Sequence, residues 1–339
     1  MIVFKELIEK YPKWNDLRTY LEDDLFRISD ENEDLCIIRY DKRVTKMVPH
    51  SKWFRSVVWN MKTNRPVCVA PPKASSGEPP ADLVCQEMLD GFMINCFKTD
   101  KVYITSRSKL DASGKFYSNK SFRELFLECE NNVDILENTF YSFLVQHKEH
   151  RLVRKIEENR VFVVHRGIVL EDGTVEIEDN PFGHIRNVNF DNQSWEFQGV
   201  VLKDCLGNRW RIRSDKYMMV RELRGNTANI TDRFAQMYTQ NLLHKYIEYY
   251  PEERSQFNAH LILINIMIKM IYDNYVEMHI KKCGCIVNKM FLPHIYNIHG
   301  MYLTTKNRIT ENDVVLYIRK QPWQRIAFLI KKCLQVIDF

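Results

Sequence analysis

The stretch Val84-Cys-Gln-Glu-Met-Leu-Asp-Gly-Phe-Met-Ile-Asn-Cys-Phe97 contains the pattern that decides how the first two thirds of this chain fold. Residues 84–88 and 92–97 are rich in apolar side chains, and turn residues separate them, which predicts two strands. The turn is Leu89-Asp-Gly91. Residues 101–105 form a further strand that pairs with the second one. This part of the chain is therefore predicted to be an antiparallel sheet.

Strand patterns continue on both sides of this stretch, whereas helical patterns are few before residue 223. Additional strands are predicted at 35–40, 53–59, 66–70, 141–146, 160–166, 197–203 and 210–213. The last two form a hairpin around Asp204-Cys-Leu-Gly207. Helical periodicity runs from Phe4 to Leu25, and Ser121 with Glu124 matches a capping box that begins a short helix.

The pattern changes near Arg224-Gly-Asn226, where alternation gives way to a period of 3.6 residues. A long helix is predicted from Ser255 towards Ile280, and two more begin at Thr310 and Pro322. The fold class is therefore α+β: two antiparallel sheets with helices, followed by an all-helical C-terminal domain. We expect domains at 1–225 and 226–339, the first comprising a helix and strand in 1–50 and a core in 51–225.

Composition is that of a globular protein without a dominant charge. The 339 residues are 45% hydrophobic and 27% charged, and the net charge of +5 permits an anionic partner without demanding one. Nine cysteines lack framework spacing, and no signal peptide is evident at Met1, so we expect an intracellular, cytoplasmic protein with reduced thiols. The strongest apolar run, 261–272, is too short to span a membrane, and no membrane partner is expected.

Five segments carry a resemblance through their order: Glu87-Met-Leu-Asp-Gly91, Thr105-Ser-Arg107, Phe143 to Val153, Phe197 to Leu202, and Arg209-Trp-Arg-Ile-Arg213 with Tyr217. The series resembles the covalent nucleotidyltransferases, which include RNA ligases, DNA ligases and mRNA capping enzymes. It is most similar to phage-type RNA ligases, and within them to the RNA-ligase-like proteins of large DNA viruses. The likeness covers roughly residues 50 to 280, and it implies that 1–225 is a nucleotidyltransferase-like domain.

The resemblance implies a specific chemistry. In such enzymes a lysine in the pattern Lys-x-Asp-Gly attacks the α-phosphate of a nucleotide and forms a phosphoramidate. Two later carboxylates hold the metal and position the nucleotide, and a basic Lys-x-Lys pair neutralises phosphate charge. ATP or another nucleotide is therefore the implied cofactor, with Mg²⁺ needed only if the chain is an enzyme.

This chain departs from that pattern at its three catalytic positions. Met88 stands where the lysine should be, and Leu144 and Gln198 stand where the two carboxylates should be. Asp90 and Gly91 are retained. A thioether cannot form a phosphoramidate, so we expect no intact catalytic residue and no metal site.

The positive charge of the implied site is retained. Arg211 and Arg213 occupy the basic pair, and Arg55 and Lys73 match basic positions upstream of the nucleophile. The predicted nucleotide- or phosphate-binding set is Asp90, Gly91, Arg55, Lys73, Arg107, Arg151, Arg211 and Arg213. The alternative for the basic residues is that they are ordinary solvated arginines and lysines on strand faces. A zinc site is disfavoured, because the Cys283-x-Cys285 spacing is poor for tetrahedral coordination; His279, His294 and His299 are the histidines considered with it.

Three functions remain open from the sequence. The first is a ligase-fold pseudoenzyme that binds RNA ends or a nucleotide without covalent lysine adenylation. The second is an active RNA ligase or related nucleotidyltransferase that uses a displaced nucleophile. The third is a viral structural or assembly protein that keeps the fold as a scaffold. Met88, Leu144 and Gln198 argue against the second, and salt-dependent RNA binding would separate the first from the third.

Overall fold

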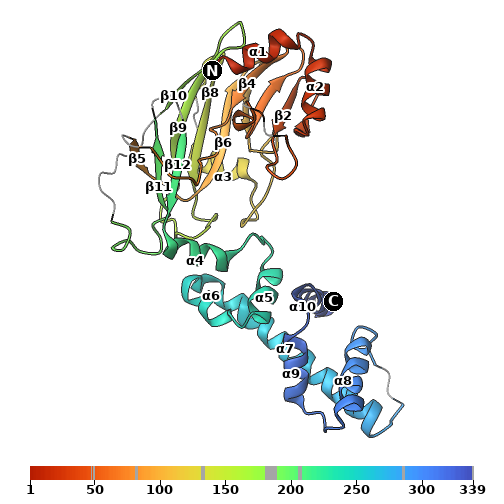
Figure 1. Cartoon of the computed structure of the whole chain (residues 1–339). Coiled ribbons are helices and arrows are strands. Elements are labelled where there is room, and N and C mark those ends of the chain that lie inside the picture. Colours follow the sequence, from red (N-terminus) through yellow and green to blue (C-terminus); the bar gives the residue numbers. More distant parts are fainter. Residues whose placement is uncertain are drawn as a thin grey trace. The chain divides into compact units, whose positions relative to one another are not determined.

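The computed structural model describes the chain except residues 47, 49, 81–82, 131–133, 180–188, 205–207, 285–286 and 338–339 (Figure 1). It divides into two compact units, Met1–Arg221 and Glu222–Phe339. The first is α+β with antiparallel sheets and the second is helical, in agreement with the predicted fold class. The division falls inside helix α4 (Asp215–Arg224), close to the boundary at residue 225 that the sequence suggested.

Three antiparallel sheets build the described part of the first unit, where the sequence predicted two (Figure 1). The four-stranded sheet has the order β1-β2-β3-β4, with β1 (Arg27–Glu31), β2 (Leu35–Arg39), β3 (Val57–Asn60) and β4 (Arg65–Val69). The five-stranded sheet has the order β10-β9-β8-β6-β7, with β6 (Phe92–Lys98), β7 (Val102–Thr105), β8 (Thr139–Gln146), β9 (Arg160–Val169) and β10 (Val175–Asp179). The three-stranded sheet has the order β12-β11-β5, with β5 (Val84–Glu87), β11 (Gly199–Lys203) and β12 (Arg209–Arg213).

Two helices, α1 (Val3–Lys10) and α2 (Trp14–Asp23), pack on the four-stranded sheet. Phe4 is fully buried, and its ring lies 5.6 Å from that of Phe54 and 6.3 Å from that of Trp59. The same hydrophobic core extends to Phe97 and Phe140 of the five-stranded sheet. The four-stranded sheet is therefore joined to one end of the five-stranded sheet by a shared apolar core.

Helix α3 (Phe122–Cys129) covers the opposite face of the five-stranded sheet. Ser121 and Glu124 form the capping box that the sequence predicted, which fixes where the helix begins. Leu125 and Phe126 are fully buried against that face, together with Ile94. Because side chains alternate along a strand, Met93 and Leu144 point to the other side, away from α3.

Several predicted elements differ in detail from the structure. The helical region at the start is two helices, because Pro12 lacks the N–H that a continuing helix needs. Residues 51–53 form a 3-10 turn, so the strand predicted at 53–59 begins later, at Val57. Strands β1 and β10 and helices α4 and α8 (Leu292–Thr305) were not predicted. The turn residues 205–207 of the predicted hairpin lie outside the described residues.

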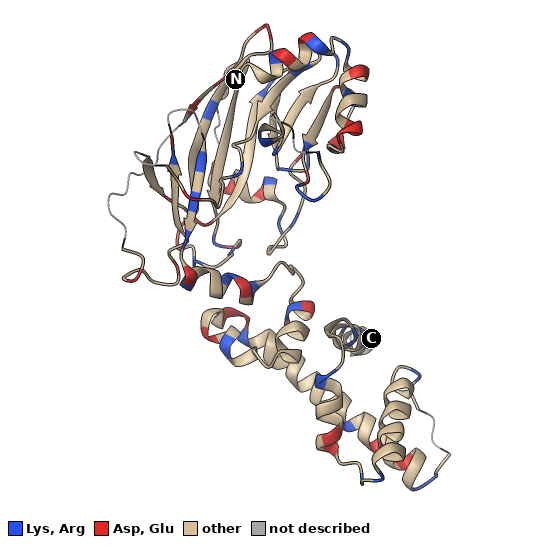
Figure 2. Cartoon of the chain, in the orientation of Figure 1, with Lys and Arg blue, Asp and Glu red and all other residues tan. Residues whose placement is uncertain are grey.

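The second unit consists of helices. Beyond α4 they are α5 (Ile230–Thr239), α6 (Leu243–Tyr249), α7 (Arg254–Tyr275), α8 (Leu292–Thr305), α9 (Glu311–Arg319) and α10 (Trp323–Ile337), with a 3-10 turn at Pro251–Glu253 and a π-helical turn at Val276–Ile280. Thr310 caps α9 through a second capping box. Figure 2 shows few charged residues along α7, which was predicted to be a buried helix. It is buried on one face only, since Ile262, Ile266 and Met270 are exposed.

A buried ion pair organises the start of this unit. Arg233 donates two hydrogen bonds to Glu253, at 2.9 Å from Nη2 to Oε1 and 3.2 Å from Nε to Oε2. Arg224 contacts the same carboxylate, and the Tyr246 hydroxyl donates to it at 2.9 Å. Burial raises the pKa of Glu253, but Arg224 and Arg233 outweigh burial and hold it below 4.5. Its stabilising effect is therefore present above pH 4.5 and is lost as the pH falls through the lowered pKa.

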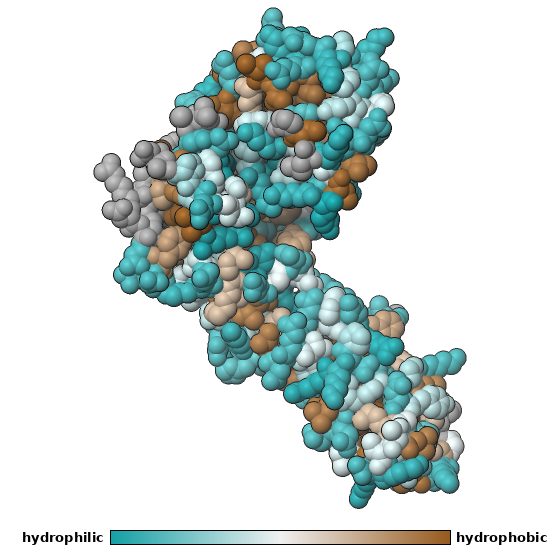
Figure 3. Space-filling model, viewed as in Figure 1, coloured by the Kyte–Doolittle hydropathy of each residue, from teal (hydrophilic) through white to brown (hydrophobic). Residues whose placement is uncertain are grey.

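On the face seen in Figure 3, hydrophilic residues cover most of the surface and hydrophobic residues lie in separate patches. Among the described residues, no helix combines the length and the hydropathy that crossing a membrane requires.

We expect Glu253→Gln to lower the free energy of unfolding by about 3 kcal/mol at pH 7, because it leaves two buried arginines without a carboxylate. Urea titration followed by circular dichroism measures this. Glu248→Gln is the matched control, since Glu248 pairs with His244 in an exposed position, and its cost should stay below about 0.5 kcal/mol. Equal costs for the two variants would show that the buried network contributes little to stability.

Candidate nucleotide-binding cleft

A cleft of about 340 Å³, here called the central cleft, lies between the three-stranded and five-stranded sheets. Both sheets and the chain segments next to them contribute side chains. The lining residues include Arg55, Gln86, Met88, Asp90, Gly91, Met93, Leu144, Val164, Gln198, Val201, Arg209, Arg213, Tyr217 and Arg221. Its volume lies in the range that holds small ligands.

Strand register explains why one face of the three-stranded sheet lines this cleft. Val201 of β11 stands between Gln86 of β5 and Arg211 of β12 in the ladder. The Met88 N–H continues that ladder by donating to the Gly199 carbonyl at 2.9 Å. Side chains two residues apart share a face, so Gln86 and Met88 point the same way.

Gly91 is required by a close approach of two backbones. A Cβ atom at this position would lie 2.5 Å from the Val145 carbonyl oxygen, which is too close for any other residue. The turn at 89–91 can therefore lie directly against strand β8. This brings Met88 near Leu144, two of the positions that the sequence associated with catalysis.

Asp90 is buried, with 4% of its surface exposed, and its carboxylate is fully engaged. One oxygen accepts from the N–H groups of Val153 at 2.9 Å and Arg154 at 3.0 Å. The other accepts from the Tyr217 hydroxyl at 3.1 Å. Burial raises the pKa of Asp90 above 3.8, although these three hydrogen bonds favour the charged form. The Asp90 carboxylate therefore connects the 89–91 turn to the backbone at 153–154 and to Tyr217, and it is not available to contact a ligand.

The central cleft is electropositive. Four arginines line it (Arg55, Arg209, Arg213 and Arg221), against the two carboxylates of Glu87 and Asp90. Burial, together with the neighbouring Arg107 and Arg209, lowers the pKa of Arg55 to about 10. Burial also lowers the pKa of Arg213, with Arg211 adding to the effect. Such crowding of cations destabilises the empty cleft and favours an anionic ligand.

Two polar atoms in the central cleft lack a hydrogen-bond partner among the described residues. They are Oε1 of Gln198 and Nε of Arg213, and both are shielded from solvent. Arg213 also donates a weak hydrogen bond from Nη1 to the sulfur of Met218 at 3.6 Å. A buried unpaired donor or acceptor costs about 1–3 kcal/mol. A ligand that offers both an acceptor and a donor would satisfy these atoms.

The structure brings together most of the residues singled out from the sequence. Those that line the central cleft are Met88, Leu144, Gln198, Asp90, Gly91, Arg55 and Arg213. Arg211 lies between Arg209 and Arg213 on the same face of β12. Lys73 and Arg107 line a neighbouring cleft, which Arg55 also lines. Arg151 is not a lining residue of either cleft, and its Nε donates to the Val153 carbonyl at 2.9 Å.

Arg209, Tyr217 and Arg221 line the central cleft but were not among the predicted binding residues, although Arg209 and Tyr217 lie in a segment that carries the resemblance. Arg209, Arg211 and Arg213 are spaced two residues apart, so the two-residue period of a strand predicts that Arg209 shares the face of the other two. Arg221 and the Tyr217 hydroxyl come from helix α4, which was not predicted. Their position follows from how α4 packs within the first unit, and no local pattern reveals it.

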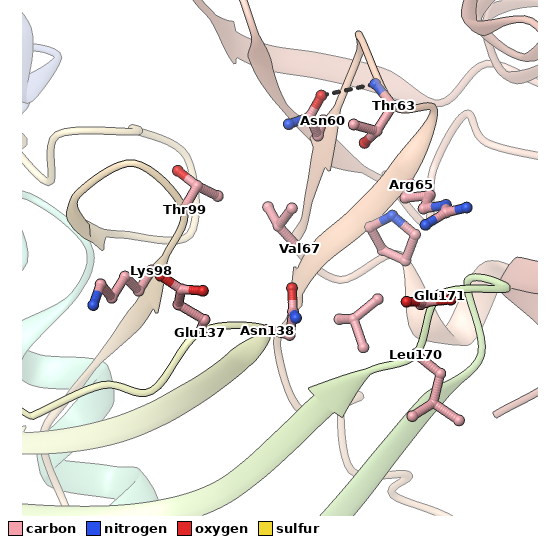
Figure 4. Close-up of a pocket in the computed structure, with 12 residues that line it drawn as sticks. Asn60, Thr63, Arg65, Val67, Lys98, Thr99, Glu137, Asn138, Leu170 and Glu171 are labelled. Atoms are coloured by element: carbon pink, nitrogen blue, oxygen red, sulfur yellow. Dashed lines mark hydrogen bonds between the residues drawn. The ribbon is translucent and has the colours of Figure 1, made fainter.

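A separate pocket of about 310 Å³ collects the ends of several strands (Figure 4). Asn60 accepts from the Thr63 N–H at 3.0 Å in the β3–β4 turn, while Lys98 ends strand β6 and Glu137 precedes strand β8. Arg65 and Lys98 face Glu137 and Glu171 here, so the charges balance. None of the residues singled out from the sequence lines this pocket, and its neutrality makes it a poor phosphate site.

Within the described part of the chain, no group of three or more His, Cys, Asp and Glu side chains is placed to hold a metal ion. Of the residues considered for zinc, His279 and His299 stack on each other with ring centroids 3.8 Å apart. His294 is buried and contacts the Tyr317 hydroxyl, and Cys283 is exposed. Cys285 lies outside the described residues.

Comparison of the chain with protein-family models gave no match, and comparison with curated proteins gave none either. The resemblance to RNA ligases therefore stays a hypothesis, carried by the motifs of the sequence.

Asp90→Ala is expected to lower the free energy of unfolding by about 3 kcal/mol, because two N–H groups and a hydroxyl lose their acceptor. Asp90→Asn should cost less, since an amide keeps one oxygen and offers an N–H to the Tyr217 hydroxyl. Urea titrations at several pH values measure both variants.

The pH dependence has a definite sign. With its pKa raised, Asp90 contributes most to stability below pH 3.8 and loses that contribution as the pH rises through the raised value. The advantage of the wild type over Asp90→Asn should therefore shrink between pH 4 and pH 7. An advantage that grows over this range would show that the hydrogen bonds outweigh burial.

Proposed function

We propose that this chain binds a nucleotide or a phosphorylated RNA end in the central cleft, without covalent lysine adenylation. It is the ligase-fold pseudoenzyme among the three functions that the sequence left open. The observation that carries the proposal is a single electropositive cleft, lined by Met88, Leu144 and Gln198 together with Arg55 and Arg213. The resemblance to nucleotidyltransferases implies that these positions lie close together in space, although Arg55 and Arg213 are more than a hundred residues apart in the sequence.

Phosphate recognition follows from the residue types in the central cleft. Arginine presents a planar fork of donors that matches phosphate oxygens in pairs, and it stays charged at any physiological pH. The Nε of Arg213 has a proton to donate, and the crowded positive charge around Arg55 is relieved by an anion. Oε1 of Gln198 would accept from an N–H or O–H of the same ligand, such as a base or a ribose hydroxyl.

The residues of the cleft argue against the ligase reaction. Met88 has no amine to attack phosphorus, so no phosphoramidate forms at this position. Leu144 and Gln198 supply no negative charge, and carboxylates are the ligands that Mg²⁺ prefers. Binding of phosphate by arginine alone needs no metal, which fits a cleft without those carboxylates.

Two alternative functions make different demands. An active ligase with a displaced nucleophile needs a lysine in the central cleft, and none of the described residues that line it is a lysine. A structural or assembly protein needs no ligand in the cleft. That function offers no partner for Oε1 of Gln198 and Nε of Arg213, which have none among the described residues.

Incubation with radiolabelled ATP or GTP and Mg²⁺ should leave the protein unlabelled, because Met88 offers no nucleophile. Denaturing electrophoresis tests this, and an acid-labile, hydroxylamine-sensitive labelled band would contradict it.

Met88→Lys alone should also fail to give a robust ligase, since Leu144 and Gln198 remain. Strong adenylation of that variant would show that these two positions are misassigned.

Arg211→Ala combined with Arg213→Ala should weaken the binding of a short 5′-phosphorylated RNA. The expected log–log slope with salt is roughly −0.7 per contacted phosphate, and the double variant should lose one to two such contacts. Fluorescence anisotropy at several salt concentrations without Mg²⁺ measures both. Equally poor binding by the wild type and the variant would favour the scaffold function.

A further inference from the structure

A second cleft of about 370 Å³, here called the basic cleft, is lined by the four-stranded sheet and neighbouring loops. Its lining is almost entirely cationic: Arg27, Arg39, Lys42, Arg43, Arg55, Lys73 and Arg107, with Tyr40 and Asp41. Figure 2 shows that Lys and Arg recur along strands of the first unit as well as in its loops. Apart from Arg55, Lys73 and Arg107, none of these residues was singled out from the sequence.

Asp41 is the carboxylate among the residues that line this cleft, and it is already paired with an arginine. Arg43 holds the Asp41 carboxylate in a bidentate pair, with Nε at 3.2 Å and Nη2 at 2.9 Å from its oxygens. That pair lowers the pKa of Asp41 to about 2, so its charge is present at every physiological pH. Arg39, Lys42 and Arg107 therefore face an excess of positive charge.

Two arginines of the cleft stand directly opposite each other in the sheet. Arg27 of β1 and Arg39 of β2 are register partners across the antiparallel pair. Like charges in this position destabilise a sheet. Arg39 is half-buried, and its Nε finds no hydrogen-bond partner among the described residues. Burial lowers the pKa of Arg39, and Arg107 and Arg27 lower it further.

The basic cleft adjoins the central cleft, because Arg55 lines both. A ligand with phosphates at regular intervals could therefore occupy the two clefts at once. Tyr40, the aromatic lining residue, is buried at 8% exposure and offers no free face on which a base could stack. The chemistry of the basic cleft suits phosphates and not bases.

We propose that the basic cleft is a second subsite, which holds the backbone phosphates of a single-stranded RNA whose terminal nucleotide lies in the central cleft. The inference rests on the proposed function and names its ligand as a strand, not a free mononucleotide. Recognition through phosphates makes binding independent of base sequence and strongly dependent on salt. Affinity should rise with strand length until both clefts are filled.

The test is fluorescence anisotropy of the full chain with 5′-phosphorylated oligouridylates of two, four and eight nucleotides, labelled at the 3′ end, without Mg²⁺. Uridine 5′-monophosphate serves as an unlabelled competitor for the central cleft. The double variant Arg39→Gln with Lys42→Gln should bind the eight-nucleotide strand about tenfold more weakly, as expected for loss of charge-assisted contacts. Its affinity for uridine 5′-monophosphate should be unchanged.

The matched control is Lys101→Gln with Arg123→Gln, which removes the same charge from exposed positions outside both clefts. A control that loses as much affinity as the cleft variant would overturn the inference. The cleft variant should also fold normally, because it removes the Arg27–Arg39 repulsion, and thermal unfolding checks this. Inorganic tripolyphosphate distinguishes a strand site from a site for free polyphosphate.

The outcomes of this experiment distinguish the second subsite in the basic cleft from the proposed function of the central cleft. Binding of mononucleotide without any gain from strand length would overturn the second subsite and leave the proposed function standing. Binding of long strands that depends on Arg39 and Lys42 but not on Arg213 would support the basic cleft and overturn the proposed function. Tripolyphosphate that binds as tightly as the eight-nucleotide strand would show that the basic cleft does not read a strand.

Discussion

The buried carboxylate of Asp90 holds the central cleft together. It accepts from the backbone of Val153 and Arg154 and from the Tyr217 hydroxyl, so one side chain joins the 89–91 turn, the segment after β8 and helix α4. Gln146 adds a bond from its side chain to the Asp90 carbonyl at 2.8 Å. The burial of a carboxylate is costly unless its lone pairs are used, and here three donors use them. Met88, Leu144 and Arg213 line the cleft beside this network of hydrogen bonds.

Positive charge in the two clefts carries a cost in the unliganded protein. Arg27 faces Arg39 across two strands, and Arg55 is buried among other arginines. Glu253 shows the contrasting solution in the helical unit, where one carboxylate satisfies Arg224 and Arg233. Arg39 leaves its Nε without a partner among the described residues, whereas Arg224 and Arg233 share a carboxylate, and this contrast is consistent with ligand binding at the clefts. Strained or unsatisfied groups are expected where function requires them.

The candidate site combines retained and lost features of the family that the sequence resembles. The Asp90-Gly91 turn depends on packing, since a Cβ at Gly91 would meet the Val145 carbonyl. Its retention therefore has a structural reason that does not require catalysis. Met88, Leu144 and Gln198 lack the amine and the carboxylates that the ligase reaction needs. The proposal of binding without catalysis accommodates both the turn and these three side chains.

Periodicity along the chain predicted the α+β class and the change to helices after the sheets, and local signals predicted features such as the Ser121–Glu124 capping box. These follow from side-chain patterns and from hydrogen bonds between residues three positions apart, which need no tertiary contact. The contact of Tyr217 with Asp90 across 127 positions, the pairing of Arg27 with Arg39, and the place of Arg55 in two clefts became evident from the folded chain alone. Such contacts depend on strand register and on the packing of sheets, and a shift of one residue would turn each side chain to the opposite face.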